Sequence, residues 1–202
     1  MPLLAANSCL KNFIQVKSNV LSHKVCDSLI AEYENEEWTS SKTMDNLSDF
    51  RSSKQICTFD KKYMNNEKRI ELDNLIYNAI NPLILDYANQ FDNFLKIERD
   101  TGYILLKYEK GNKYEEHIDD AGRIIYDSNG TIDKDSITKR KITLCLALND
   151  NYEGGGLSFF NNTYKPKWRK GDALLFPSFA MFPHQALAVT NGIRYSLVTW
   201  VE

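Results

Sequence analysis

Apolar residues in the first hundred positions recur at the spacing of an amphipathic helix. They fall every four residues from Leu21 to Tyr33, and Ser22 stands where a helix N-cap is expected. Residues four apart lie on one face of an α-helix, and an N-cap serine can accept a bond from a free backbone N–H. The pattern therefore predicts a helix over residues 22–36 with one face buried.

A second stretch of helical periodicity covers residues 66–91, where isoleucine and leucine recur at short helical intervals. Pro82 falls inside it. Because proline lacks the backbone N–H and clashes with the preceding turn, we expect the helix to kink or divide there. The polar stretch 39–60 separates the two helices and predicts a loop with one strand at 54–59.

The second half of the chain has the pattern of short strands separated by turns. All nine glycines lie at or after Gly102, and β-branched and aromatic residues alternate with turn signals. We expect strands near 97–108, 114–119, 141–149, 156–161, 172–176, 182–189 and 193–201. This predicts a mainly β fold, a double-stranded β-helix (jelly roll), with the N-terminal helices packed on its major sheet.

A length of 202 residues is typical of one domain. We expect a single unit, 1–202, in which a helical support region, 1–96, precedes a jelly-roll core, 97–202. The net charge of −2 argues against nucleic acid and anionic membranes as partners. The short basic run 139–141 is interpreted as a solvated strand entry.

The four cysteines have neither metal-finger nor CxxC spacing, so we expect free thiols in a reducing compartment. The first residues lack the pattern of a signal peptide. No apolar run is long enough to cross a bilayer. The sequence therefore favours a cytoplasmic protein that does not associate with membranes.

Two of the three histidines stand in a pattern typical of a metal site. His117 and Asp119 form a His-x-Asp pair in a predicted strand, so both side chains project from one face. His184 lies in an otherwise apolar predicted strand. Two imidazoles and one carboxylate leave coordination positions open on iron for a cosubstrate and O2. Taken singly, each feature also fits a polar strand end or a hydrogen-bonded core histidine.

Arg194 connects these residues. It lies in an apolar strand without an acidic neighbour, and a buried guanidinium favours a carboxylate partner. We expect a three-residue turn at 190–192, ending in glycine, and a hairpin in which Arg194 pairs with Ala188. In that hairpin Arg194 and Ser196 share a face with His184. A dicarboxylate held by the metal at one end would then reach the arginine.

Three motifs follow one another in the second half of the chain. They are Tyr108-x-x-Gly111-x-x-Tyr114-x-x-His117-x-Asp119, then Leu148-Asn149-Asp150 with Glu153-Gly154-Gly155-Gly156-Leu157-x-Phe159, then Lys170-Gly171-Asp172 with His184 and Asn191-Gly192-x-Arg194-Tyr195-Ser196. In this order they resemble the Fe(II)/2-oxoglutarate-dependent dioxygenases, and among these the catalytic domain of prolyl 4-hydroxylases. The resemblance covers about residues 100–202.

The resemblance implies three ligands for Fe(II), which are His117, Asp119 and His184. It implies that Arg194 binds the distal carboxylate of 2-oxoglutarate, helped by Ser196 and Tyr108. It also implies oxidative decarboxylation of 2-oxoglutarate to succinate and CO2, coupled to hydroxylation, with ascorbate as a candidate reductant. The cofactor supplies this chemistry, so no catalytic side chain beyond the metal ligands is expected.

Three positions depart from the prolyl 4-hydroxylase pattern. Ala147 stands where these enzymes often carry a tyrosine that contacts the cosubstrate, and Gly156 replaces the acidic residue after the Gly-Gly pair. Collagen-type enzymes favour lysine at the position of Arg194. The departures point to a branch other than the collagen type.

We expect hydroxylation of a peptidyl side chain such as proline, with a free amino acid or a small metabolite as the alternative substrate. Residues 120–139 and 39–54 are candidate substrate-contacting loops. A non-catalytic jelly-roll binding module is the alternative from another class. Two other enzyme classes fit the sequence less well. Alkylated-base demethylases carry a second arginine where this chain has Trp200, and a zinc hydrolase would leave Arg194 without a role.

Overall fold

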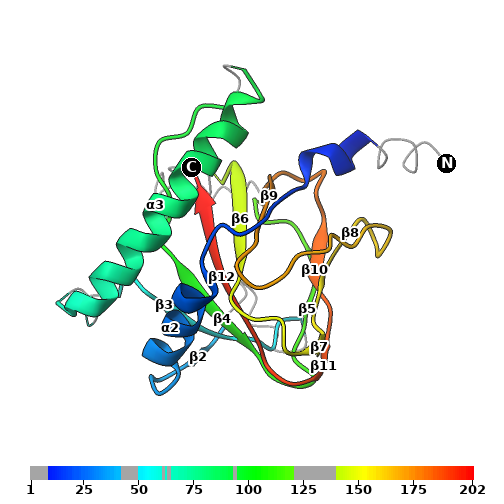
Figure 1. Cartoon of the computed structure of the whole chain (residues 1–202). Helices are drawn as coiled ribbons and strands as arrows, with labels where there is room; N and C mark the ends of the chain where they lie inside the picture. Colours follow the sequence, from blue (N-terminus) through cyan, green and yellow to red (C-terminus); the bar gives the residue numbers. More distant parts are fainter. Residues whose placement is uncertain (1–8, 42–49, 61, 63–64, 93–94, 121–139) are drawn as a thin grey trace, which may run out of the picture.

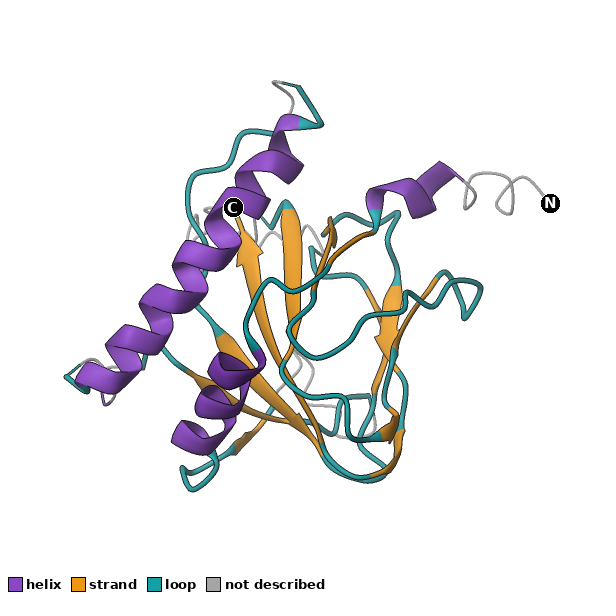
Figure 2. Ribbon diagram, in the orientation of Figure 1, coloured by secondary structure: helices purple, strands orange, loops and turns teal. Residues whose placement is uncertain are grey.

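The computed structural model describes residues 9–41, 50–60, 62, 65–92, 95–120 and 140–202. Its strands form a large and a small sheet on opposite sides of an apolar interior, and two helices cover the outer face of the large sheet (Figures 1 and 2). This is the double-stranded β-helix expected from the sequence. Most of the candidate loop 120–139, and residues 42–49 of the other, lie outside the described residues.

Helix α2, His23–Tyr33, begins where the sequence indicated. The Ser22 side chain caps it by accepting a bond from the backbone N–H of Val25 at 3.3 Å. Helix α3, Glu67–Asn89, contains Pro82 but continues through it, so the expectation of a divided helix is wrong. Its buried residues recur every four positions from Leu72 to Ile84, and this packed face supports the turn that proline weakens. A short 3-10 helix, η1, covers Lys11–Phe13.

The large sheet is antiparallel, with strand order β1-β9-β6-β12-β4-β3-β2. Its strands are β1 (Gln15–Lys17), β2 (Thr39–Ser40), β3 (Lys54–Cys57), β4 (Ile104–Tyr108), β6 (Ile142–Ala147), β9 (Ala173–Pro177) and β12 (Arg194–Val201). The small sheet has the order β5-β10-β8, formed by β5 (Tyr114–His117), β10 (His184–Ala186) and β8 (Leu157–Phe159). A third pair joins β7 (Glu153–Gly154) to β11 (Val189–Asn191).

The strand expected at 97–108 begins only at Ile104, although Asp100 bridges to Val201. The strand expected at 182–189 is two short ones, β10 and β11. The predicted hairpin is also wrong, because β12 pairs with β4 and β6 whereas β10 and β11 pair with strands outside the large sheet. In a jelly roll, successive strands can alternate between facing sheets, so the turn before β12 carries the chain from one sheet to the other.

Glycine is nevertheless required in that turn, as the sequence suggested. Gly192 has φ +76°, and a Cβ there would lie 3.0 Å from the carbonyl oxygen of Asn151. A side chain at this position would be strained both by the left-handed backbone and by the close carbonyl. The expectation that this turn ends in a glycine is therefore confirmed, although the strands that flank it do not pair.

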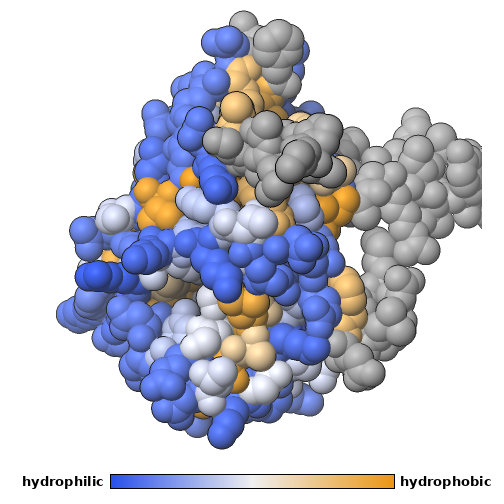
Figure 3. Space-filling view, turned by 90° about the vertical axis from the view of Figure 1, so that its right-hand side faces the viewer, coloured by the Kyte–Doolittle hydropathy of each residue, from blue (hydrophilic) through white to orange (hydrophobic). Residues whose placement is uncertain are grey.

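Strand β12 separates two apolar layers because its side chains alternate between faces. Leu197 and Val201 pack toward the helices, whereas Val198 and Trp200 point into the interior between the sheets. The side of the molecule that carries the small sheet is largely hydrophilic, with separate apolar patches (Figure 3). Among the described residues, no helix has both the length and the apolar character to cross a bilayer.

Candidate metal and cosubstrate site

The His-x-Asp pair and the distant histidine meet at the small sheet. His117 ends β5 and His184 begins β10, and the two stand opposite each other in register. Asp119 Oδ1 lies 3.7 Å from Nε2 of His117, and Asp119 Oδ2 lies 3.5 Å from Nε2 of His184. One ligand atom from each residue falls within 4.8 Å of the other two. The arrangement suits a single ion bound on one face.

Both imidazoles are oriented by backbone carbonyls. Nδ1 of His117 lies 2.7 Å from the carbonyl oxygen of Glu115, and Nδ1 of His184 lies 3.1 Å from that of Phe182. A carbonyl only accepts, so each ring carries its proton on Nδ1 and leaves Nε2 free as a ligand. The tautomer that a metal needs is therefore set by the strand ends.

Asp119 lies just beyond β5, not inside it as expected from the sequence. The chain bends at Asp119, and the next backbone N–H, that of Asp120, donates to the carbonyl of Ser178 at 2.9 Å. The Thr143 hydroxyl on β6 donates to Asp119 Oδ2 at 2.6 Å and contacts the Ser178 hydroxyl at 2.8 Å. Supporting hydrogen bonds of this kind fix the direction of a metal-binding carboxylate.

The triad is electrostatically prepared to bind a cation. Burial lowers the pKa of His117 to about 3, with a further contribution from His184, while Asp119 opposes the shift. Burial alone would raise the pKa of Asp119, but the two histidines and the Thr143 hydroxyl hold it below its ordinary value. Neutral imidazoles and an ionised carboxylate are the forms that bind a metal.

Aromatic rings surround the triad. The Tyr114 ring stacks on His117 with centroids 3.5 Å apart and planes at 16°. Phe159 and Phe176 lie against His184, at 5.5 and 4.7 Å between centroids. These rings pack apolar surface against both imidazoles of the triad.

Arg194 is buried at the start of β12, with 3% of its surface exposed. It stands in register with Tyr108 on β4, and its guanidinium carbon lies 5.0 Å from the tyrosine ring and 5.8 Å from the ring of Trp168. Among the described residues, neither Nη1 of Arg194 nor the Ser196 hydroxyl has a hydrogen-bond partner. A buried cation with a free donor beside a free hydroxyl fits a carboxylate.

Gly155 makes room for this arginine. A Cβ there would lie 2.8 Å from Cγ2 of Val189 and 3.4 Å from Cδ of Arg194, and its φ is +63°. A Cβ at Gly156 would meet nothing within 4 Å. The Gly-Gly pair therefore has a packing reason at its second position, and the absence of the family's acidic residue at Gly156 leaves open space.

The interior face of β6 joins the two ends of the site. Thr143, Cys145 and Ala147 alternate inward along it, and Ala147 stands in register with Ser196. At one end Thr143 bonds Asp119, and at the other Ala147 borders the region of Arg194. Burial raises the pKa of the Cys145 thiol to about 12, so it is neutral. Because Ala147 is small, it leaves space on the interior face of β6 that a tyrosine side chain would occupy.

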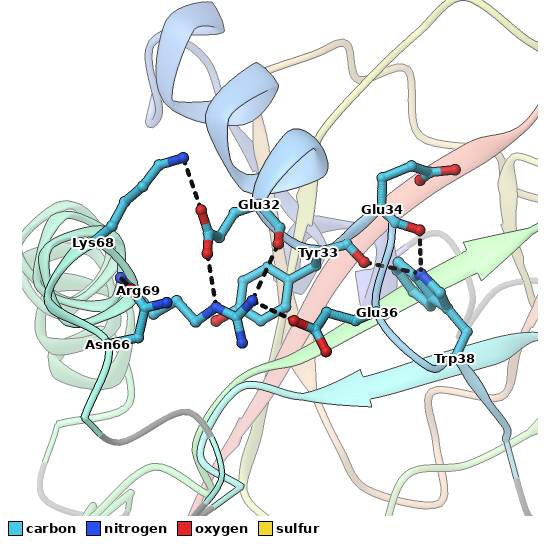
Figure 4. Close-up of polar contacts among 8 residues, drawn as sticks. All are labelled: Glu32, Tyr33, Glu34, Glu36, Trp38, Asn66, Lys68 and Arg69. Atoms are coloured by element: carbon cyan, nitrogen blue, oxygen red, sulfur yellow. Dashed lines mark hydrogen bonds and ion pairs between the residues drawn. The ribbon is translucent and has the colours of Figure 1, made fainter.

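A polar clamp holds β4 and β12 from the helix side. Tyr195 and Lys107 stand in register next to the Arg194–Tyr108 pair but face the opposite way. The Glu34 carboxylate, at the end of α2, accepts from the Tyr195 hydroxyl at 2.5 Å and from Lys107 Nζ at 2.8 Å. Figure 4 shows Glu34 beside Trp38, apart from the ion pairs that join α2 to Arg69 of α3.

Four residues that border the site were not identified from the sequence. They are Thr143, Trp168, Arg51 and Arg140. The interpretation of 139–141 as a solvated strand entry is wrong for Arg140, which is half-buried 3.7 Å over the Trp200 ring and donates to the carbonyl of Asp119 at 3.2 Å. A threonine in an otherwise apolar strand was the one available signal for Thr143.

The jelly roll thus places two imidazoles and a carboxylate that suit a metal ion at one end, and at the other a buried arginine whose Nη1, among the described residues, is free for an acidic ligand. Residues 103–202 match the model of the 2OG-Fe(II) oxygenase superfamily. Through this segment the chain belongs to that superfamily, whose cofactors are Fe(II) and 2-oxoglutarate.

Similar proteins agree with this placement. A PKHD-type hydroxylase of Synechococcus sp. (strain CC9311) is 33% identical over 102 residues, which cover 50% of this chain and 41% of that protein. One of Psychrobacter sp. (strain PRwf-1) is 33% identical over 99 residues, 47% of this chain and 35% of that protein. The match thus spans less than half the length of either relative.

Solved structures share the fold across nearly the whole chain. A Trichoplax adhaerens prolyl hydroxylase, solved with a hypoxia inducible factor oxygen degradation domain peptide, has a TM-score of 0.71 at 19% identity and covers 98% of this chain and 86% of its own. A Pseudomonas putida prolyl-4-hydroxylase has a TM-score of 0.68 at 20% identity, with 100% of each chain covered. At this identity the likeness establishes the fold.

Proposed function

We propose that this chain is an Fe(II)- and 2-oxoglutarate-dependent dioxygenase that hydroxylates an unactivated C–H bond, on a peptidyl side chain such as proline. Succinate and CO2 are the coproducts. One observation carries the proposal. The same interior has a preoriented metal triad at one end and, at the other, a buried arginine whose Nη1 has no partner among the described residues.

Each residue has a defined task in this reaction. His117, Asp119 and His184 hold the metal, which when bound supplies the oxidative chemistry. Arg194 binds the distal carboxylate of 2-oxoglutarate, and its fork of donors fixes the cosubstrate along the floor of β6. Ser196 donates a further hydrogen bond to that carboxylate. The Tyr108 ring, 5.0 Å from the guanidinium carbon, keeps the fork in place.

The peptide assignment is supported by what similar proteins act on. The Trichoplax adhaerens enzyme was solved with a peptide fragment, and other solved neighbours are prolyl hydroxylases. A free amino acid or a small metabolite is the alternative substrate. The four cysteines are free thiols, which supports a reducing compartment and a cytoplasmic enzyme. We also propose that residues 1–96 support the core and that the whole chain acts as one domain.

The test is formation of succinate from 2-oxoglutarate with Fe(II) and ascorbate, together with a gain of one oxygen by proline-containing peptides and by cell-extract components. We expect His184→Ala to abolish substrate-stimulated succinate formation. His23→Ala is the matched control, because His23 is exposed at the start of α2, away from the triad. Equal turnover in wild type and the His184 variant would disprove the metal assignment. If metal-loaded protein does not bind 2-oxoglutarate, the chain is a non-catalytic module.

A further inference from the structure

A column of three stacked groups rises from the metal triad. The Arg51 guanidinium carbon lies 4.5 Å above the Tyr114 ring, and that ring lies 3.5 Å from the His117 imidazole. Arg51 forms an isolated bridge with Tyr114, so the backbone also fixes this position. A full positive charge is thus separated from His117, a proposed metal ligand, by the Tyr114 ring alone.

Arg140 borders the same site from another element. It donates to the carbonyl of Asp119 at 3.2 Å, and its guanidinium carbon packs 3.7 Å over Trp200. Both arginine charges act on the Tyr114 phenol. The charges of Arg51, which precedes β3, and Arg140, which precedes β6, therefore both lie on the side of the triad where Tyr114 lies.

Among the described residues, most donors of the two guanidinium groups have no hydrogen-bond partner. Arg51 donates through Nε to the Ser53 hydroxyl at 3.0 Å, and Arg140 donates through Nη1. Within the part of the chain that the structure describes, neither forms an ion pair with a carboxylate. A guanidinium has five donors, and a half-buried one is stabilised when an anion takes them.

The acidic groups that face Arg140 are already engaged. Asp119 is a metal ligand, Glu202 pairs with Arg99 at 2.9 Å, and Asp120 has a partner of its own. Among the residues that the structure describes, the carboxylates therefore leave the terminal donors of Arg51 and Arg140 available to a ligand.

We propose that Arg51 and Arg140 form a binding site for a carboxylate of the primary substrate, beside the metal and separate from the cosubstrate position at Arg194. The inference rests on the proposed function, because it places the group to be oxidised over the metal. It narrows the substrate to an acid, either a free amino acid bound through its α-carboxylate or a peptide with an aspartate or glutamate near the target residue.

The experiment uses the full chain loaded with Mn(II), which binds imidazole and carboxylate ligands, and saturated with 2-oxoglutarate. The probes are L-proline against L-prolinamide, and acetyl-Asp-Pro-Ala-amide against acetyl-Asn-Pro-Ala-amide. Paramagnetic broadening of the probe proton signals reports binding near the metal without any turnover. Titration of 2-oxoglutarate into a separate Mn(II)-loaded sample that holds no cosubstrate tests the proposed function independently.

We expect the charged member of at least one pair to bind more tightly than its neutral partner. Arg51→Gln and Arg140→Gln should each weaken binding of that acid roughly tenfold, the usual size of a lost hydrogen bond to a charged group. Lys54→Gln is the matched control, because it removes an equal charge three residues from Arg51 where Lys54 pairs with Glu109 at the surface. This variant should keep the preference.

Each outcome decides between the two sources or against the site. Preference for proline over prolinamide identifies the free acid, and preference for the aspartate peptide identifies a peptide side chain. Two results would overturn the inference while the proposed function stands. In both, 2-oxoglutarate binds, but either the charged and neutral probes of each pair bind equally well or no probe binds at all. An equal loss of preference in the Lys54 variant would also overturn it, since the effect would then be long-range.

Discussion

Arg194 and Tyr108 stand directly opposite each other on β12 and β4, with the guanidinium carbon 5.0 Å from the ring centre. Their neighbours Tyr195 and Lys107 form the adjacent pair on the other face, and both bind Glu34. The strand pair is therefore fixed from the helix side at the point where it presents the arginine to the interior. Cosubstrate affinity should depend on both faces.

Arg194→Ala should mainly raise the 2-oxoglutarate concentration needed for turnover. A charge-assisted hydrogen bond contributes about 1.5–3 kcal/mol, so we expect roughly a 10- to 100-fold increase in KM for 2-oxoglutarate with a smaller change in kcat. Succinate formation at varied 2-oxoglutarate measures it. Arg99→Ala, which removes an exposed arginine paired with Glu202, is the control. An unchanged KM in the Arg194 variant would rule out the assigned role.

Glu34→Gln should raise the same KM by a smaller factor, roughly threefold, since the clamp is part-exposed and acts through the strands. Glu32→Gln lies on the same helix but breaks the ion pairs with Arg69 and Lys68 of α3. It should lower thermal stability and leave KM as in wild type. If both variants shift KM equally, the effect is general loosening of α2 and not the clamp.

Gly155→Ala and Gly156→Ala form a matched pair. The added methyl at 155 would press on Val189 at 2.8 Å and Arg194 at 3.4 Å in a left-handed backbone, whereas at 156 it meets open space. We expect the first to destabilise the fold by about 1 kcal/mol or more and to weaken 2-oxoglutarate binding. The second should do neither. Urea unfolding and 2-oxoglutarate titration of the metal-loaded variants separate the two effects.

The sequence predicted the elements better than their connections. Ser22 and the four-residue spacing defined α2, and local patterns located most strands because alternation and turn residues are local properties. The pairing of β12 was missed because sheet membership depends on contacts between distant segments. The sequence predicted that Arg194 pairs with Ala188 in a hairpin. In the structure Arg194 instead stands opposite Tyr108 on β4, a residue from much earlier in the chain.

The site was predictable to the extent that it is encoded in motifs. His117, Asp119 and His184 meet as expected, and Arg194 is buried as its apolar strand indicated. The supporting residues carry no such signal. Arg51 reaches the triad only through a stacked ring, from a segment that looked like a polar loop, so only the folded chain shows it.

Thr143→Val should weaken metal binding, because Asp119 Oδ2 would lose the hydroxyl that orients it at 2.6 Å. Loss of such a supporting hydrogen bond costs about 10- to 100-fold in metal affinity. Thr199→Val is the control, since the Thr199 hydroxyl is buried and has no partner among the described residues. Its replacement should leave metal affinity unchanged. Competition with a fluorescent chelator measures both, and equal affinities in the two variants would contradict the assignment.

Stability of the metal-free protein should fall as the pH is lowered from 6.5 toward 3. Burial lowers the pKa of His117 from 6.5 to about 3, so in this range the unfolded chain binds a proton that the folded chain excludes. The contribution is fully present above pH 6.5, and its loss follows a slope of at most about 1.4 kcal/mol per pH unit. The lowered pKa of Asp119 acts in the same direction below its ordinary value of 3.8. In urea unfolding at several pH values, His117→Gln should flatten this dependence and His23→Gln should keep it. Parallel curves for wild type and the His117 variant would refute the electrostatic account.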